Sequence, residues 1–218
     1  MSLPVIVIGG GGHAKVLINT LLDLSVSILG FTDCDAANID LTILGIRALG
    51  NDDVILQYPS NSIQLVNGLG SVRSTQKRKK IFEFFKKQAY TFASVVHPAS
   101  IISRDVVLSE GAQVMAGTVI QPGCRIGRNA IINTKVSVDH DCLIGDHVHL
   151  APGATLSGMV SVGSDTHIGT GATVIQGIHI GQNSRIGAGS LLLKDVPAGA
   201  TAVGVPAKVL YTCTQEKD

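Results

Sequence analysis

The 218-residue sequence has no tryptophan, and aromatic residues make up only 4% of it, although 45% of its residues are hydrophobic. An apolar core with so few rings fits stacked layers of Val, Ile, Leu and Ala better than a conventional globular interior. The first apolar run, Val5 to Ile8, is far too short to cross a bilayer, and no basic segment precedes it. We therefore expect no membrane insertion, no secretion signal and a cytoplasmic location.

The sequence also lacks a charge excess and any cysteine motif. Seventeen basic and sixteen acidic side chains give a net charge of +1, so no global field attracts nucleic acid, and an anionic ligand must be held locally. The four cysteines (Cys34, Cys124, Cys142 and Cys213) are far apart without a CxxC pair. We expect reduced thiols rather than disulfides or zinc ligands.

An aliphatic residue stands at every sixth position from Val96 to Leu192. Neither a helix nor a simple alternating strand has this period, whereas a solenoid with six-residue sides does. Glycine follows the aliphatic residue at intervals of eighteen, so three sides form one coil: Gly127, Gly145, Gly163 and Gly181. We predict a parallel β-helix over residues 93–195, followed by a cap and tail at 196–218.

Residues 1–92 are typical of a small α/β domain. The strand Val5 to Ile8, four glycines and a helix over 14–24 predict a Rossmann-like βαβ unit with its second strand at 26–31. Further strands are expected at 42–46 and 62–66. A helix is expected at 74–88, whose lysines we interpret as a solvated face, with a phosphate or membrane contact as the alternative.

The glycine turn can bring a phosphate close to a helix N-terminus, although a tight turn without a ligand is the alternative interpretation. Asp33, about twenty residues further on, could contact a ribose or a base edge. The expected substrate-binding residues are Gly10, Gly11, Gly12, His13 and Asp33.

Five of the seven histidines lie in the solenoid beyond the hinge at 92–98: His140, His147, His149, His167 and His179. His149 and His167 are eighteen residues apart and should stack in adjacent coils at roughly 5 Å. His140 and His149 are nine apart, half a coil, so they should meet only across a subunit contact. Asp139 and Asp141 flank His140 and could orient it as a base. Strand alternation would point His140 and Asp141 to opposite faces, so either aspartate could be the partner.

The unbroken hexad ladder, His140 to Gly145 with His149 following, Gly204 to Lys208, and the leading glycine turn resemble the left-handed β-helix, hexapeptide-repeat acyltransferases. The resemblance is to the branch containing nucleotide-amino-sugar N-acetyltransferases and sialic acid O-acetyltransferase-like proteins. It implies left-handed coils, a homotrimer, a sugar nucleotide on the glycine turn, and acetyl-CoA between adjacent helices. Many relatives carry a projecting loop, but this ladder has no insertion, which puts any substrate contact from such a loop in doubt.

The resemblance also implies roles for individual residues. His140 would be the general base and Asp141 its partner, while His149 would contact the acetyl thioester from a neighbouring subunit. The other coenzyme contacts would be Gly158, Thr170, Ala188, Pro206 and Lys208.

The expected activity is direct acetyl transfer from acetyl-CoA to the amine, at C4, of a nucleotide-linked deoxy-amino sugar in bacterial surface glycan biosynthesis. Cys142 belongs to the small interior register, so we expect no covalent intermediate, and no metal is expected. The alternatives are O-acetylation of a sialic acid or related sugar, a non-catalytic sugar-nucleotide-binding regulator, and a zinc enzyme like the γ-class carbonic anhydrases. The nucleobase and the sugar stay open.

Overall fold

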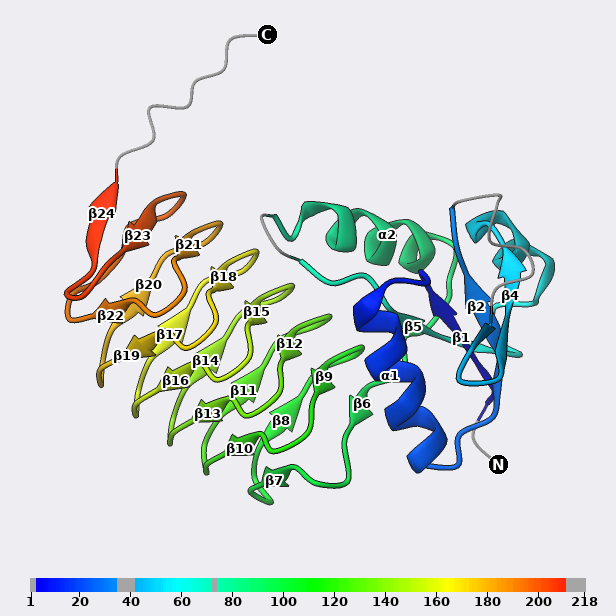
Figure 1. The fold of residues 1–218 in the computed structure, drawn as a ribbon, viewed down its shortest axis with the longest axis horizontal. Helices are drawn as coiled ribbons and strands as arrows, with labels where there is room; N and C mark the ends of the chain where they lie inside the picture. Colours follow the sequence, from blue (N-terminus) through cyan, green and yellow to red (C-terminus); the bar gives the residue numbers. More distant parts are fainter. Residues whose placement is uncertain (1–2, 35–41, 72–73, 211–218) are drawn as a thin grey trace, which may run out of the picture.

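The computed structural model describes residues 3–34, 42–71 and 74–210. It contains an N-terminal α/β unit and a long stack of three-sided coils (Figure 1). Parallel pairing at intervals of eighteen residues joins each coil to the next; His149, for example, pairs with His167. The predicted succession of an α/β unit and a parallel β-helix is confirmed.

The N-terminal unit is a five-stranded sheet with one helix packed on each face. Val5 and Val7 pack with α1, and the alternate residues Ile6 and Ile8 pack with α2. The sheet order is β3-β4-β2-β1-β5, and β3 is antiparallel to β4. The elements are β1 (Val5–Ile8), α1 (Gly12–Asp23), β2 (Ile28–Thr32), β3 (Thr42–Ile43), β4 (Ile46–Gly50), the 3₁₀ helix η2 (Asp52–Gln57), β5 (Gln64–Asn67) and α2 (Gln76–Lys87).

Two local details differ from the sequence-based expectation. Residues 42–46 were expected to form one strand, but Leu44 and Gly45 have positive φ (51° and 82°) and turn the chain back between β3 and β4. Two consecutive residues with positive φ are typical of a tight hairpin turn. The helix α1 begins at Gly12 rather than Ala14, with Gly11 as its N-cap.

Three sheets form the sides of the β-helix; we call them sheets I, II and III. Sheet I is the longest, and its last two strands form an antiparallel hairpin at the C-terminal edge. Its strands are β6 (Val95–Val96), β9 (Gln113–Val114), β12 (Ile131–Ile132), β15 (His149–Leu150), β18 (His167–Ile168), β21 (Arg185–Ile186), β23 (Thr201–Val203) and β24 (Lys208–Leu210). Sheet II contains β7 (Ile101–Ile102), β10 (Val119–Ile120), β13 (Ser137–Val138), β16 (Thr155–Leu156), β19 (Thr173–Val174) and β22 (Leu191–Leu192). Sheet III contains β8 (Val107–Leu108), β11 (Arg125–Ile126), β14 (Leu143–Ile144), β17 (Ser161–Val162) and β20 (His179–Ile180).

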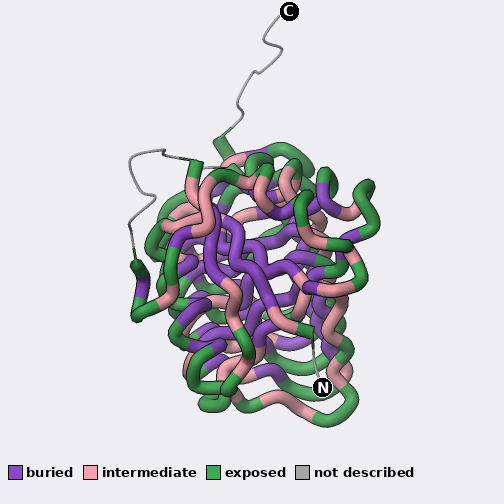
Figure 2. The backbone as a smooth tube through the Cα atoms, turned by 90° about the vertical axis from the view of Figure 1, so that its right-hand side faces the viewer, coloured by how far each residue is buried: buried purple, intermediate pink, exposed green. Residues whose placement is uncertain are grey.

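The aliphatic ladder fills the interior of the coils. From Val114 to Leu192 every ladder residue is buried, and the small residues Cys124 and Cys142 are buried with them. Seen from the side of the N-terminal unit, buried segments run through the middle of the molecule and exposed residues lie around its outside (Figure 2). Cys34 is exposed, and Cys213 lies outside the described residues.

The backbone conformation at the corners of the coils is also periodic. Every sixth residue from 111 to 189 has positive φ, whether it is glycine or, as at Asn129, Asp141 and His147, another residue. This left-handed conformation costs a non-glycine residue free energy, which stacking of the coils must offset. The glycines of the eighteen-residue period have a different reason, because a Cβ on Gly127 would lie 2.5 Å from the backbone of Gly145 in the next coil.

The N-terminal unit is anchored on sheet I by the cations of α2. Arg78 is 1% exposed and donates hydrogen bonds to the backbone carbonyls of Asn129 and His147. Lys79 forms an ion pair with Asp165 at 2.8 Å, and Lys86 forms one with Glu110 at 2.7 Å. The interpretation of the lysine-rich face as solvated is therefore wrong for Lys79 and Lys86, which attach the helix to the β-helix. In the described ranges, no helix is long and apolar enough to cross a membrane.

Candidate active site

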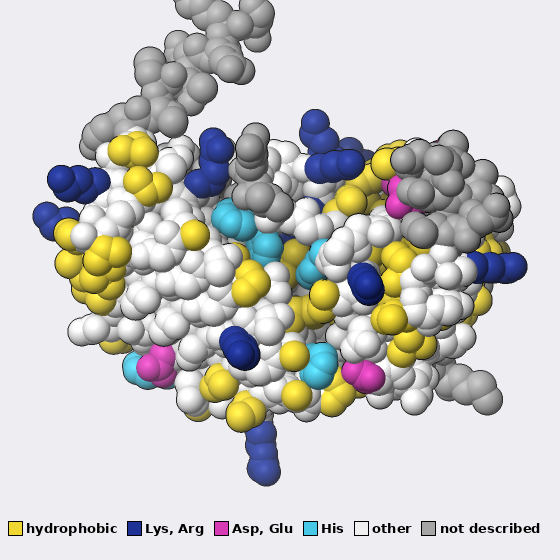
Figure 3. All heavy atoms as spheres, viewed as in Figure 1, with side chains coloured by type: hydrophobic (Ala, Val, Ile, Leu, Met, Phe, Trp, Pro, Cys, Tyr) yellow, Lys and Arg dark blue, Asp and Glu magenta, His cyan; other side chains and the backbone are white. Residues whose placement is uncertain are grey.

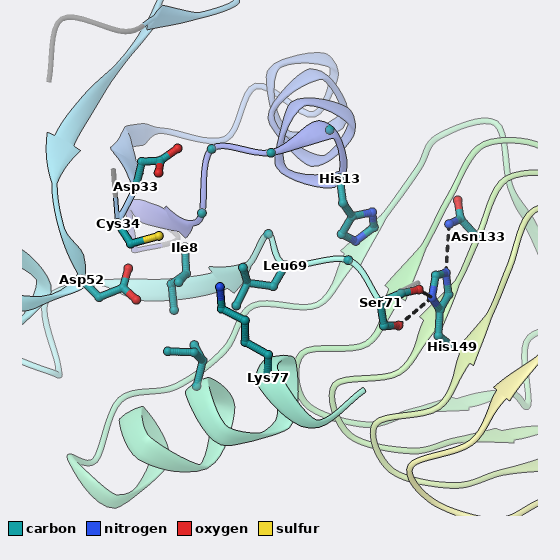
Figure 4. Close-up of a pocket in the computed structure, with 17 residues that line it drawn as sticks. Ile8, His13, Asp33, Cys34, Asp52, Leu69, Ser71, Lys77, Asn133 and His149 are labelled. Atoms are coloured by element: carbon teal, nitrogen blue, oxygen red, sulfur yellow. Dashed lines mark hydrogen bonds between the residues drawn. The ribbon is translucent and has the colours of Figure 1, made fainter. Parts of the chain in front are cut away.

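A pocket of about 660 Å³ opens where the carboxyl ends of β1, β2 and β5 meet sheet I (Figure 4). The five expected substrate-binding residues line it together, as does His149. The backbone of the glycine turn leads directly into α1, whose first amide groups and positive dipole end favour a negatively charged ligand. The pocket therefore suits a phosphorylated molecule.

The space beside the glycine turn is free for a ligand. A Cβ on Gly11 or Gly12 would meet nothing within 4 Å, and both residues are exposed. Gly10 differs, because a Cβ there would collide with the carboxylate of Asp33 and with the ring of Phe31. Gly10 thus allows Asp33 to approach the turn, while Gly11 and Gly12 leave space free.

His13 points from the start of α1 toward the β-helix (Figure 4). Its Nε2 lies 2.7 Å from Oε1 of Gln113, whose amide nitrogen donates to the carbonyl of Asn67 at 2.7 Å. The oxygen of Gln113 therefore faces the ring, so Nε2 carries the hydrogen and Nδ1 is an acceptor. Burial, opposed by this hydrogen bond, lowers the pKa of His13 to about 4, so the ring is neutral at pH 7.

Two carboxylates and a lysine extend the pocket away from the β-helix. Asp52 accepts a hydrogen bond of 2.5 Å from the hydroxyl of Thr32, and Asp33 stands at the end of β2. Lys77, at the start of α2, lines the pocket opposite them. These groups offer contacts for hydroxyl, base-edge and phosphate groups.

His149 lies on the sheet I wall of the pocket and is buried (Figure 4). Nδ1 is 2.7 Å from Oγ and 2.9 Å from the carbonyl oxygen of Ser71, and Nε2 is 3.1 Å from the amide nitrogen of Asn133. The ring of His167 stacks edge-on at a centroid distance of 4.9 Å, as expected. Histidine side chains gather at the junction of the two parts of the chain (Figure 3). Burial, reinforced by His167, holds the pKa of His149 well below its usual value.

His140 stands on a different face, at the corner between β13 and β14, and its side chain is 52% exposed. Its Nδ1 forms a hydrogen bond of 2.9 Å with Oδ2 of Asp141. Strand alternation does not apply here, because Asp141 is in a turn with φ 59° and its side chain reaches the ring. Asp139 instead accepts a hydrogen bond from the backbone nitrogen of His140 at 2.8 Å. Asp141 raises the pKa of His140 above its ordinary value.

Two glycines, which have no side chain, make room for His140 and Asp141. A Cβ on Gly158, one coil further on, would lie 2.5 Å from Nε2 of His140, and a Cβ on Gly123 would collide with Asp141. The next residue, Cys142, is buried, and burial raises the pKa of its thiol to about 12. A thiol so seldom ionised is unsuited to act as a nucleophile at neutral pH.

One chain does not bring all the expected residues together. His140 and Asp141 do not line the glycine pocket, whereas His149 does. Thr170 and Ala188 line a second pocket of about 340 Å³ on sheet I with His167 and Arg185. Pro206 and Lys208 are exposed near the β23–β24 hairpin, and Gly158 lies beside His140.

The chain matches two family profiles, one in each part. Residues 4–85 match the family described as PglD N-terminal domain, and residues 159–194 match the bacterial transferase hexapeptide family. A histidine-to-asparagine variant of perosamine N-acetyltransferase from Caulobacter crescentus, solved with CoA and GDP-perosamine, is 35% identical with a TM-score of 0.89. The match covers 96% of this chain and 97% of that one.

Other relatives agree. The acetyltransferase domain of PglB from Neisseria gonorrhoeae, solved with acetyl coenzyme A, is 30% identical with a TM-score of 0.87 over 95% of this chain and 98% of that one. The curated GDP-perosamine N-acetyltransferase of Escherichia coli O157:H7 is 32% identical over 90 residues; the match spans 41% of this chain and 41% of the relative.

The chain belongs to the left-handed β-helix acyltransferase family. This membership confirms the resemblance seen in the sequence and makes the chain an acyltransferase. Acetyl-CoA is the expected co-substrate, and crystals of the relatives contain CoA or acetyl coenzyme A. In the part of the chain that the structure describes, no group of three or more His, Cys, Asp or Glu side chains is arranged to hold a metal ion.

No local signal in the sequence singles out Ser71, Gln113 and Asn133, which line or support the site of this acyltransferase. Lys77 belongs to the lysine-rich helix for which a phosphate contact is the alternative interpretation. Gln113 lies 100 residues from His13 and Asn133 lies 16 residues from His149, so neither contact follows the eighteen-residue period. No local motif marks such residues. A register drawing of sheet I, in which Gln113 and His149 occupy equivalent strand positions, could have found Gln113.

Proposed function

We propose that the chain transfers the acetyl group of acetyl-CoA to the C4 amine of a nucleotide-linked deoxy-amino sugar. The relatives solved with GDP-perosamine make a GDP-linked amino sugar the first candidate. The sugar nucleotide would lie in the glycine pocket, with its diphosphate at the start of α1. The product would supply the biosynthesis of a bacterial surface glycan.

The observation that carries the proposal is the His140–Asp141 hydrogen bond of 2.9 Å on a rigid corner of the coils. A carboxylate on Nδ1 fixes the tautomer with a lone pair on Nε2, which is what a general base needs. The sugar amine is mostly protonated at neutral pH, and His140 would accept the proton that it must lose. The neutral amine then attacks the thioester carbonyl carbon. The C–N bond forms, the C–S bond breaks, and the proton that the nitrogen loses on becoming an amide is taken up by the leaving sulfur, so that CoA leaves as the thiol.

A second subunit would complete the site. His140 and the glycine pocket lie on different faces of one chain, so a symmetric homotrimer could place His140 of one subunit beside the pocket and His149 of the next. Acetyl-CoA would then lie between subunits, with Thr170 and Ala188 along it and Gly158, Pro206 and Lys208 near it. Arg185 offers a positive charge there for the coenzyme's phosphates.

The test combines binding and turnover. Ligands that bind only the folded protein raise its melting temperature, so GDP-, UDP-, dTDP- and CMP-linked 4-amino sugars are compared with and without CoA. Acetylation by acetyl-CoA is then followed by mass spectrometry. We expect a GDP-linked amine to bind and be N-acetylated. Acetylation of a sugar hydroxyl instead, or of none of the four amines, would contradict the proposal.

A further inference from the structure

The imidazole of His149 has a hydrogen-bond partner at each edge, and each partner has a fixed chemical character. Nδ1 faces the carbonyl oxygen of Ser71 at 2.9 Å. A backbone carbonyl can only accept, so Nδ1 must carry a hydrogen. The hydroxyl of Ser71 lies at 2.7 Å from the same nitrogen and can accept from it or donate elsewhere.

The opposite edge gives the same answer independently. The backbone nitrogen of Thr134 donates to Oδ1 of Asn133 at 2.8 Å, which fixes the orientation of that amide. Its nitrogen therefore faces Nε2 of His149 at 3.1 Å (Figure 4). An amide nitrogen can only donate, so Nε2 is the acceptor and carries no hydrogen.

We propose that Ser71 and Asn133 hold His149 as the neutral tautomer with its hydrogen on Nδ1, and that His149 in turn positions the amide of Asn133 for acyl transfer. The inference rests on the proposed function for its place in the reaction. A bare Nε2 cannot donate a hydrogen bond to the thioester oxygen. The second N–H of the Asn133 amide, a residue that lines the pocket, is the donor that the site offers there. His149 then supports this donor rather than acting as one.

The arrangement joins the two parts of the chain. Ser71 follows Leu69 and Gly70, which line the glycine pocket, while Asn133 and His149 belong to the β-helix. A sugar nucleotide that contacts the loop at 68–71 thus touches the segment that fixes His149.

The direct test is nitrogen NMR on the free protein with ¹⁵N-labelled histidine, which needs no substrate. The His149 signals are identified by their absence from a His149→Gln variant. We expect one protonated nitrogen, Nδ1, and one unprotonated nitrogen, Nε2. Ser71→Ala is the matched control, because it keeps the backbone carbonyl and should leave the tautomer unchanged.

Asn133→Asp is the variant that should change the tautomer of His149. The carboxylate keeps an acceptor for Thr134 but places a second acceptor at Nε2, so that nitrogen must gain a proton, as an imidazolium or as the other tautomer. Turnover should fall by about 10²-fold, as on removal of one oxyanion donor, with little change in KM for the sugar nucleotide.

A hydrogen on Nε2 in the unchanged protein would overturn the proposal, and so would an unaltered His149 spectrum in a folded Asn133→Asp variant. If that variant does not fold, the spectra of the unchanged protein and of Ser71→Ala decide. A protein with the expected spectrum that acetylates no amine would count against the proposed function alone.

Discussion

His140 and His149 are nine residues apart on the same repeat, yet their surroundings are opposite. His140 is half exposed beside a carboxylate that raises its pKa, whereas His149 is buried between Ser71 and Asn133 with a lowered pKa. The first can take up and release a proton near neutral pH, and the second is held neutral. A regular scaffold can thus give one residue type two chemical roles, because half a coil of rotation changes what packs against it.

The strongest way to break this comparison is to remove the proposed base. His140→Asn keeps the size of the side chain but cannot accept a proton at neutral pH, so kcat should fall by roughly 10² to 10⁴ with little change in ligand affinity. Steady-state kinetics and calorimetry measure the two effects. His179→Asn is the control, because His179 is also an exposed histidine of the β-helix and lies two coils further on, in β20. Equal losses in both variants would contradict a special role for His140.

The glycine pocket can be tested separately from the base. Gly11→Val adds a side chain where a Cβ meets nothing within 4 Å, so the fold should tolerate it while the phosphate site is obstructed. Losing one charge-assisted hydrogen bond, about 1.5–3 kcal/mol, should weaken sugar-nucleotide binding roughly tenfold to a hundredfold. CoA binding should be unchanged in titration calorimetry. A matching loss of CoA affinity would mean that the turn has only a structural role.

The docking of α2 on the β-helix can be tested through Arg78. Arg78→Met would leave the buried carbonyls of Asn129 and His147 without their donor, and should lower the free energy of unfolding by about 2–4 kcal/mol. Urea denaturation measures this, with Lys80→Met on the exposed side of the same helix as the control. Equal stability of the two variants would show that Arg78 does not anchor the helix.

The smallest expected effect is that of Asp141 on the pKa of His140. Asp141 raises the pKa of His140, and the base is active only above that pKa. In Asp141→Asn the pKa falls, so the acid limb of the pH dependence of kcat/KM should move to lower pH. An acid limb that stays in place would assign it to another group.

Local and periodic signals in the sequence predicted most of this architecture. The six-residue ladder defined the coils because each aliphatic residue meets its equivalents eighteen residues away, and the glycine turn predicted the strand and helix around it. The His140–Asp141 pairing could not be chosen over Asp139, because it depends on the left-handed backbone at Asp141. The docking of Arg78 and the contacts of Ser71 and Asn133 join segments about 16 to 78 residues apart. These separations do not follow the repeat of the coils, so no pattern in the sequence predicts the contacts.

The most direct test of a site shared between subunits is complementation. His140→Asn and His149→Ala chains are mixed under conditions in which subunit exchange is verified, and acetyl transfer is compared with that of each variant alone. In a hybrid of the proposed trimer, some interfaces would pair an intact His140 from one chain with an intact His149 from the next. The account predicts that activity rises above that of both parents. No recovery after verified exchange would contradict it.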